Sequence, residues 1–182
     1  MRKFVSILLT LALSLSLLAG CGSKTPATET TQTPAVSVEG TMEELLNNII
    51  AENPVEFFGG VIPIDLTDTS EDGLWAVKSF TGLDDASSIT EAAAFEPMMG
   101  SMAFSLVAVR VAPEADAKAV AEAMKAGIDT RKWICVEAND LLVAGYGDVV
   151  MLIMLNTEGG MTAQSFVDAF QTVVGAEAAF VI

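Results

Sequence analysis

The chain of 182 residues has no histidine, two cysteines, and nine lysine or arginine residues against 24 aspartates and glutamates. The absence of histidine removes the commonest general base and metal ligand, and with it every Ser-His-Asp and Cys-His arrangement for nucleophilic catalysis. Gly-x-Ser-x-Gly, Ser-x-x-Lys and P-loop motifs are absent as well. The sequence therefore lacks the familiar signatures of enzymes, and it predicts no cofactor.

The first 20 residues have the order of a secretory signal. Arg2 and Lys3 precede an uncharged, largely apolar run over 4–18, which ends in the small residues Ala19 and Gly20. At ~1.5 Å per residue this run is about 22 Å long as a helix, which is shorter than the ~30 Å hydrocarbon core. We therefore do not expect it to remain as a transmembrane helix.

The residues LAGC, Leu18 to Cys21, resemble the lipobox of bacterial lipoproteins. In these proteins the cysteine becomes the first residue of the mature chain and carries lipid on its sulfur and its amino group. Two or more acyl chains anchor a protein stably, whereas one chain does so only marginally. We expect lipid attachment at Cys21 and a protein held at the extracytoplasmic face of the cell membrane. The alternative is an ordinary secretory signal with Cys21 left as a free thiol.

Positive charge is scarce after this processing. Removal of Arg2 and Lys3 with the signal leaves seven basic residues against 24 acidic ones, a net charge of −17. Nucleic acid is excluded as a partner, because its binding needs clustered lysine and arginine to neutralise phosphates. An anionic membrane surface repels such a domain too, so contact with the membrane is expected through the lipid on Cys21.

The composition divides the chain into three parts. Residues 1–20 are the signal peptide, residues 21–40 are the lipidated cysteine and a Thr- and Pro-rich tether expected to be disordered, and residues 41–182 are one globular domain. Only Cys135 remains in the domain, so no disulfide can form within it.

Capping residues and apolar periodicity predict four helices in the domain. Thr41 and Glu44 form a capping box, a second helix follows Ser70 and turns Leu74, Val77 and Phe80 inward, and two more begin at Pro113 and Thr162.

The predicted strands lie between the helices. They cover 102–111, 149–155, the pieces 133–136 and 141–144, and 89–95. For 89–95 a helix is the alternative. Residues 61–66 form a short extended segment, whose proline argues against a central position in a sheet. Two strands are apolar on both faces and need cover on both sides. We predict an α+β fold with a mostly antiparallel sheet of about four to five strands covered by helices. The alternative is a monomer with one open face that dimerises.

The segments EPMMGSMAFSLVAVRV, DTRKWICVEA and GDVVMLIM, within 96–154, resemble a family of uncharacterised bacterial lipoproteins, mostly of Gram-positive anaerobes, that is known as a domain of unknown function. The resemblance covers roughly residues 70–156. It implies secretion, anchoring and a single small α+β domain, and it implies no catalytic residues.

Arg131, Lys132 and Trp133 bring two cations and an aromatic ring together in a chain poor in both. Arg131 and Trp133 are therefore candidates for partner binding, Arg131 through a carboxylate or phosphate and Trp133 through an amphipathic face. The structural interpretation is that the cations follow a helix end and that Trp133 starts a buried strand. Cys135 is interpreted as a buried, inert residue.

Two other groups suggest metal binding, and each has a simpler explanation. Met98, Met99 and Met102 suit Cu(I), but methionine also fills gaps in cores. The acidic segment 65–73 has oxygen ligands for Ca²⁺, but it lacks EF-hand spacing and makes sense as a helix start. We predict no metal site.

Together these features favour a surface lipoprotein that is not an enzyme and whose domain is a binding or accessory module for an unidentified protein partner. The alternative is a hydrolase that uses carboxylates, with or without Ca²⁺, on cell-wall material. Capture of a small ligand is a third possibility, but such proteins usually have two lobes.

Overall fold

The computed structural model describes residues 36–182, and Cys21 and the predicted signal peptide lie outside them. Eleven elements follow one another in this part of the chain: α1 (Met42–Glu52), β1 (Gly59–Pro63), α2 (Glu71–Thr81), β2 (Ile89–Pro97), β3 (Phe104–Val111), α3 (Ala117–Gly127), β4 (Asp140–Tyr146), β5 (Val149–Leu155), the 3-10 turn η1 (Thr157–Gly159), α4 (Ala163–Val174) and β6 (Phe180–Val181).

The strands form one antiparallel sheet in the order β1-β2-β3-β5-β4-β6. The predicted α+β fold with an antiparallel sheet is confirmed, with six strands in place of four to five. β1, which ends in Pro63, lies at an edge, as expected from its proline. β6 was not predicted, because two residues are too short to give a period.

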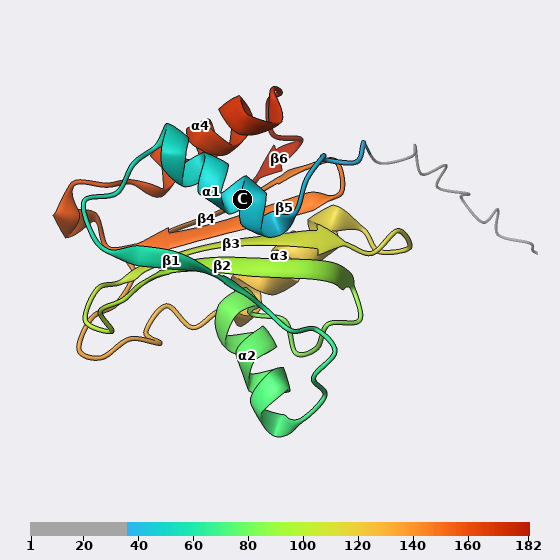
Figure 1. Cartoon of the computed structure of the whole chain (residues 1–182), viewed down its shortest axis with the longest axis horizontal. Helices are drawn as coiled ribbons and strands as arrows, with labels where there is room; N and C mark the ends of the chain where they lie inside the picture. Colours follow the sequence, from blue (N-terminus) through green and yellow to red (C-terminus); the bar gives the residue numbers. More distant parts are fainter. Residues whose placement is uncertain (1–35) are drawn as a thin grey trace, which may run out of the picture. The chain divides into compact units, whose positions relative to one another are not determined.

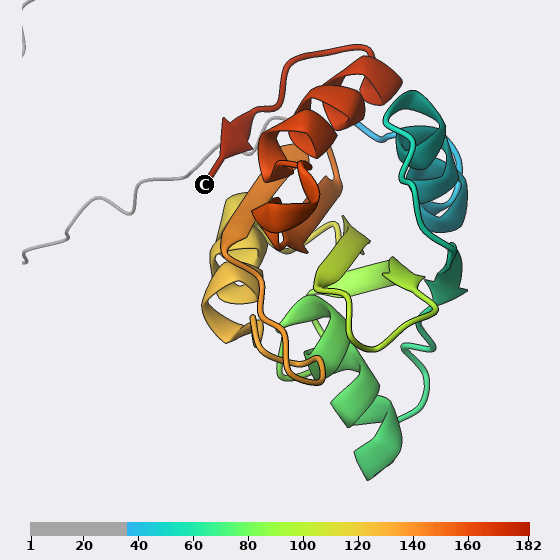
Figure 2. The same ribbon diagram turned by 90° about the vertical axis from the view of Figure 1, so that its left-hand side faces the viewer.

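Helices cover both faces of the sheet (Figures 1 and 2). One face packs against α1 and α4 through Phe104, Leu106 and Ile153, and the other packs against α2 and α3 through Val107 and Leu152. Neither face is open for the dimer considered as the alternative. β3 and β5 are thus apolar on both sides because each side faces helices.

The predicted helix starts are mostly correct. Thr41 and Glu44 make both hydrogen bonds of a capping box, and Ser70 and Thr162 cap α2 and α4. The start at Pro113 was wrong, because Asp116 accepts a hydrogen bond from the backbone N–H of Ala119 and α3 begins only after it.

On α2 the prediction of inward residues holds in part. Val77 is buried and Phe80 packs against the core, but the side chain of Leu74 is 39% exposed.

The strand predicted over 133–136 is absent. These residues lie in an irregular loop, 128–139, which joins α3 to β4, and Cys135 has a positive φ of 65°. That conformation is uncommon for a residue with a side chain and does not fit an extended strand.

The described residues, 36–182, form one compact unit. Both hydrophobic clusters draw their side chains from this unit alone. It therefore carries its own core, and we expect it to fold on its own. No helix within residues 36–182 has the length and apolarity to cross a bilayer.

Candidate functional site

Large apolar side chains gather in solvent at one end of the sheet. Phe58, Met98, Met99 and Ile134 are 89%, 82%, 56% and 73% exposed. We call these four residues the tip. Methionine and aromatic side chains are enriched in the cores of protein interfaces, so a group of them in solvent marks a candidate binding surface.

Backbone hydrogen bonds hold the three segments of the tip together. The N–H of Met98 donates to the carbonyl of Phe58 at 2.9 Å, which continues the β1–β2 ladder beyond the pair Gly59 and Pro97. The N–H of Ile134 donates to the carbonyl of Gly100 at 3.0 Å and so joins the loop 128–139 to the β2–β3 connection. These loops lie at the left in Figure 1, and Figure 2 views the domain from that side.

Lys132 fixes the loop 128–139 to the sheet. Its Nζ donates to Glu96 Oε1 at 2.8 Å, to Ser105 Oγ at 3.1 Å and to the carbonyl of Ser79 at 3.2 Å. It also lies over the Phe80 ring, 5.0 Å from the centroid. Lys132 therefore has a structural role, because its ammonium is directed inward and its hydrogen bonds are satisfied.

Burial of Lys132 lowers its pKa, and the opposing charge and hydrogen bond of Glu96 only partly offset this effect. A lysine of lowered pKa beside a serine has the composition of a Ser-Lys catalytic pair. However, Ser105 is fully buried and hydrogen-bonded to Glu96. This geometry supports the loop and gives a substrate no path to the hydroxyl.

The two candidates for partner binding lie in the same loop, next to the tip. Arg131 is exposed and pairs with Glu137 at 3.4 Å, while Trp133 is half-buried and packs against the core under α2 and α3. Trp133 does not start a strand. Arg131 thus lies at the surface of the loop that also carries Ile134, and Trp133 has mainly a packing role.

The prediction of a buried Cys135 is wrong, because its side chain is exposed. The apolar neighbours Ile134 and Val136 suggested a strand interior, whereas the loop turns at Cys135 with its positive φ. Cys135 lines a shallow depression of about 300 Å³ together with Arg131, Trp133, Val136 and Glu137.

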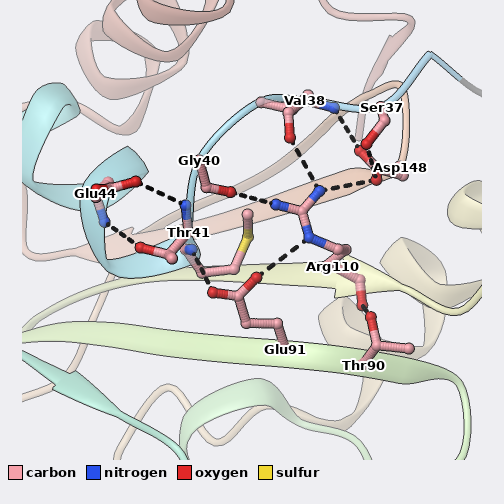
Figure 3. A network of polar contacts seen from close by, with 10 residues as sticks. Ser37, Val38, Gly40, Thr41, Glu44, Thr90, Glu91, Arg110 and Asp148 are labelled. Atoms are coloured by element: carbon pink, nitrogen blue, oxygen red, sulfur yellow. Dashed lines mark hydrogen bonds and ion pairs between the residues drawn. The ribbon is translucent and has the colours of Figure 1, made fainter.

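A polar cluster occupies the opposite end of the sheet (Figure 3). Arg110, near the end of β3, donates to Asp148 at 2.8 Å and to Glu91 at 3.2 Å, and also to the backbone carbonyls of Val38 and Gly40 at 3.1 and 2.6 Å. We call Arg110, Glu91 and Asp148 the Arg110 cluster. It holds residues that the sequence assigned to the end of the tether.

The carboxylates of the Arg110 cluster bind the same segment. Asp148 accepts hydrogen bonds from the N–H of Val38 at 2.8 Å and the hydroxyl of Ser37 at 3.0 Å, and Glu91 accepts one from the N–H of Met42 at 2.8 Å. Burial acts to raise the pKa of Asp148, but the hydrogen bonds from Val38, Arg110 and Ser37 outweigh burial and keep that pKa below its ordinary value.

The acidic segment 65–73 has a local structural role. Asp65 accepts hydrogen bonds from both the N–H and the hydroxyl of Thr67, and Asp68 accepts one from the N–H of Ser70. These hydrogen bonds lower the pKa of both carboxyls. Within residues 36–182 no three His, Cys, Asp or Glu side chains are grouped so as to hold a metal ion.

Sequence reasoning missed half of the tip. Phe58 and Ile134 were not singled out, and Met98 and Met99 were weighed only as metal ligands or core residues. The usable signal was the run of apolar residues at a connection, EPMMGSM, between two strands. No known protein family, curated protein or solved structure matches the chain.

Proposed function

We propose that this chain is a lipoprotein, anchored through lipid on Cys21 to the extracytoplasmic face of the cell membrane, and that its domain is a non-catalytic binding module for a partner protein. We further propose that it belongs to the lipoprotein family that its sequence resembles. The tip is the docking surface in this proposal, with Arg131 at its border.

One observation carries the proposal: the tip and the segment leading to the N-terminus are at opposite ends of the sheet. Phe104 begins β3 at the tip end, and Arg110 holds Val38 and Gly40 at the other end. A strand of eight residues spans about 27 Å at ~3.4 Å per residue. An anchor on the N-terminal side therefore leaves the tip free to meet a partner.

The Arg110 cluster gives the attachment a defined direction. Without it, the chain would join the domain only at Thr41, where α1 is capped. With it, residues 37–42 contact three side chains of the sheet end. A flexible tether would then begin at the end of the sheet that is farthest from the tip.

Site-specific photocrosslinking in living cells tests the binding surface. A photoreactive residue replaces Met98 at the tip in one strain and Val181 on β6 in another, because Val181 is also an exposed apolar residue. We expect a discrete crosslinked protein from position 98, and its loss when Phe58→Ser is added. The absence of an adduct from position 98, or equal adducts from both positions, would contradict the proposal.

A further inference from the structure

Three exposed carboxylates belong to the segments that carry or adjoin the tip. Glu56 is two residues before Phe58, and Asp129 is the second residue of the loop that carries Ile134. Glu158 lies in the turn after Asn156, whose N–H donates to the carbonyl of Ala103. All three side chains belong to exposed residues. In the described part of the chain none of the three forms an ion pair.

Most basic side chains of residues 36–182 are paired with carboxylates. Residues 36–182 contain 23 acidic and six basic residues. Four of the six basic side chains are in ion pairs, among them Arg131 and Lys132 in the tip loop. Lys118 and Lys125, both on α3, form no ion pair within these residues. In the segments of the tip, the unpaired charges of Glu56, Asp129 and Glu158 are thus negative, whereas Arg131 and Lys132 are paired with carboxylates.

The negative charge of these carboxylates favours some binding partners for the tip and disfavours others. An anionic lipid surface is repelled by the carboxylates, and so is a second copy of a domain whose net charge is −17 over residues 36–182. A segment that is apolar on one face and positive at its edges complements both the side chains of the tip and these carboxylates. Methionine suits such a segment, because its flexible thioether adapts to different apolar partners.

We infer that the tip binds a cationic amphipathic segment of the partner protein. This inference rests on the proposed function and adds the chemistry of the partner. The apolar face of the segment contacts Phe58, Met98, Met99 and Ile134, and its lysine or arginine side chains approach Glu56, Asp129 and Glu158. Binding is expected to weaken as salt concentration rises, because the carboxylates are solvent-exposed.

The direct test measures peptide binding to residues 33–182 by fluorescence anisotropy. The probe is a short amphipathic helix of leucine and lysine. One control peptide carries glutamate in place of each lysine, and a second has the same composition as the probe in an order without an apolar face. We expect the leucine-lysine helix to bind and both controls to bind at least about tenfold more weakly.

Two sets of variants localise the binding. Phe58→Ser with Ile134→Ser is expected to weaken it by about tenfold or more, and Val181→Ser to leave it unchanged. Glu56→Gln, Asp129→Asn and Glu158→Gln together are expected to weaken it and to reduce its salt dependence. The matched control is Glu39→Gln, Glu122→Gln and Glu177→Gln, which removes the same charge from exposed positions elsewhere and is expected to have little effect. Thermal melts establish that each variant is folded.

Several outcomes would overturn the inference. In the peptide assay they are equal or tighter binding of the leucine-glutamate helix, no binding of any peptide, and equal effects of the two charge variants. Two other results would also overturn it: recruitment of residues 33–182 to vesicles containing phosphatidylglycerol through Phe58, and self-association of the domain through the tip. The crosslink from position 98 separates this failure from failure of the proposed function. If a discrete protein adduct persists there, the tip binds a protein and only the cationic chemistry is wrong.

Discussion

At the scale of single residues, Arg110 joins the N-terminal segment to the sheet. Its side chain is 19% exposed and lies between Glu91 and Asp148. In Arg110→Ala both carboxylates would lose their cation, and the carbonyls of Val38 and Gly40 would lose a charged donor. We expect a loss of about 2 to 3 kcal/mol in the free energy of unfolding, measured with urea. Arg110→Lys should recover only part of this loss, because a single ammonium cannot span both carbonyls and both carboxylates. A loss below about 0.5 kcal/mol for Arg110→Ala would contradict this role.

The lowered pKa of Asp148 predicts how acid affects the stability that the Arg110 cluster contributes. Its folded pKa lies below its value of ~3.9 in an unfolded chain, so its contribution to stability is complete above that value and is lost as pH falls through the folded pKa. The stability difference between the native chain and Asp148→Asn should be constant between about pH 5 and 7 and should narrow below about pH 4. Urea unfolding at several pH values measures it. In an Arg110→Ala background the stability difference between chains without and with Asp148→Asn should depend less on pH, because Arg110 no longer stabilises the carboxylate. A stability difference independent of pH down to about pH 2 would contradict the lowered pKa of Asp148.

Cys135 gives a simple test of the loop conformation. Its thiol is exposed, although its sequence neighbours suggested a buried strand. We expect a maleimide reagent to label residues 33–182 under native conditions within about tenfold of the rate in denaturant. Cys135 is the sole cysteine of this segment, so the label reports on one position. Protection by about a hundredfold or more would place the thiol in the core and contradict the described loop.

At the scale of elements, the loop 128–139 depends on its buried ion pair. Lys132→Met would leave Glu96 12% exposed without its cation, and we expect a loss of about 2 to 3 kcal/mol in unfolding free energy. The double variant Lys132→Met with Glu96→Met removes both charges and should be more stable than Lys132→Met alone. Calorimetry or urea unfolding of the native chain, Lys132→Met, Glu96→Met and the double variant measures the coupling energy between the two side chains. Additive losses would show that the pair does not act as a unit.

Elements with strong local signals were predictable from the sequence. Caps located α1, α2 and α4, and continuous apolar runs located β3 and β5, because these signals depend on neighbours in the chain. The strand expected at 133–136 failed for the opposite reason. Lys132 directs its ammonium to Glu96 and Ser105, which are distant in sequence, and this contact fixes a loop where the apolar residues alone suggested a strand.

The candidate site was predictable only in part, because it too depends on contacts between residues that are distant in sequence. Arg131 and Trp133 pointed to the loop that also carries Ile134 of the tip, since two cations beside an aromatic ring are unusual in this composition. Phe58 is joined to Met98 only through the pairing of β1 with β2, and Ile134 is exposed in a loop where a strand was predicted. Such tertiary contacts leave no local pattern.

At the scale of the whole molecule, the strong negative charge and the two covered sheet faces predict a monomer. Copies of the domain repel one another, and its main apolar surfaces lie under helices. We expect light scattering on residues 33–182 to give the mass of one chain across protein concentrations. A stable dimer at physiological salt that is lost on Phe58→Ser would show that the tip pairs with itself.

In the proposed function the domain is attached to the membrane at one end and binds its partner at the other. The most direct measurement is the intact mass and first residue of the mature protein extracted from membranes, compared with Cys21→Ser. We predict a chain that begins at Cys21 and carries acyl groups there, and a Cys21→Ser chain that carries none and is no longer retained on the membrane. A mature chain that begins elsewhere, or one with an unmodified Cys21, would contradict attachment through Cys21.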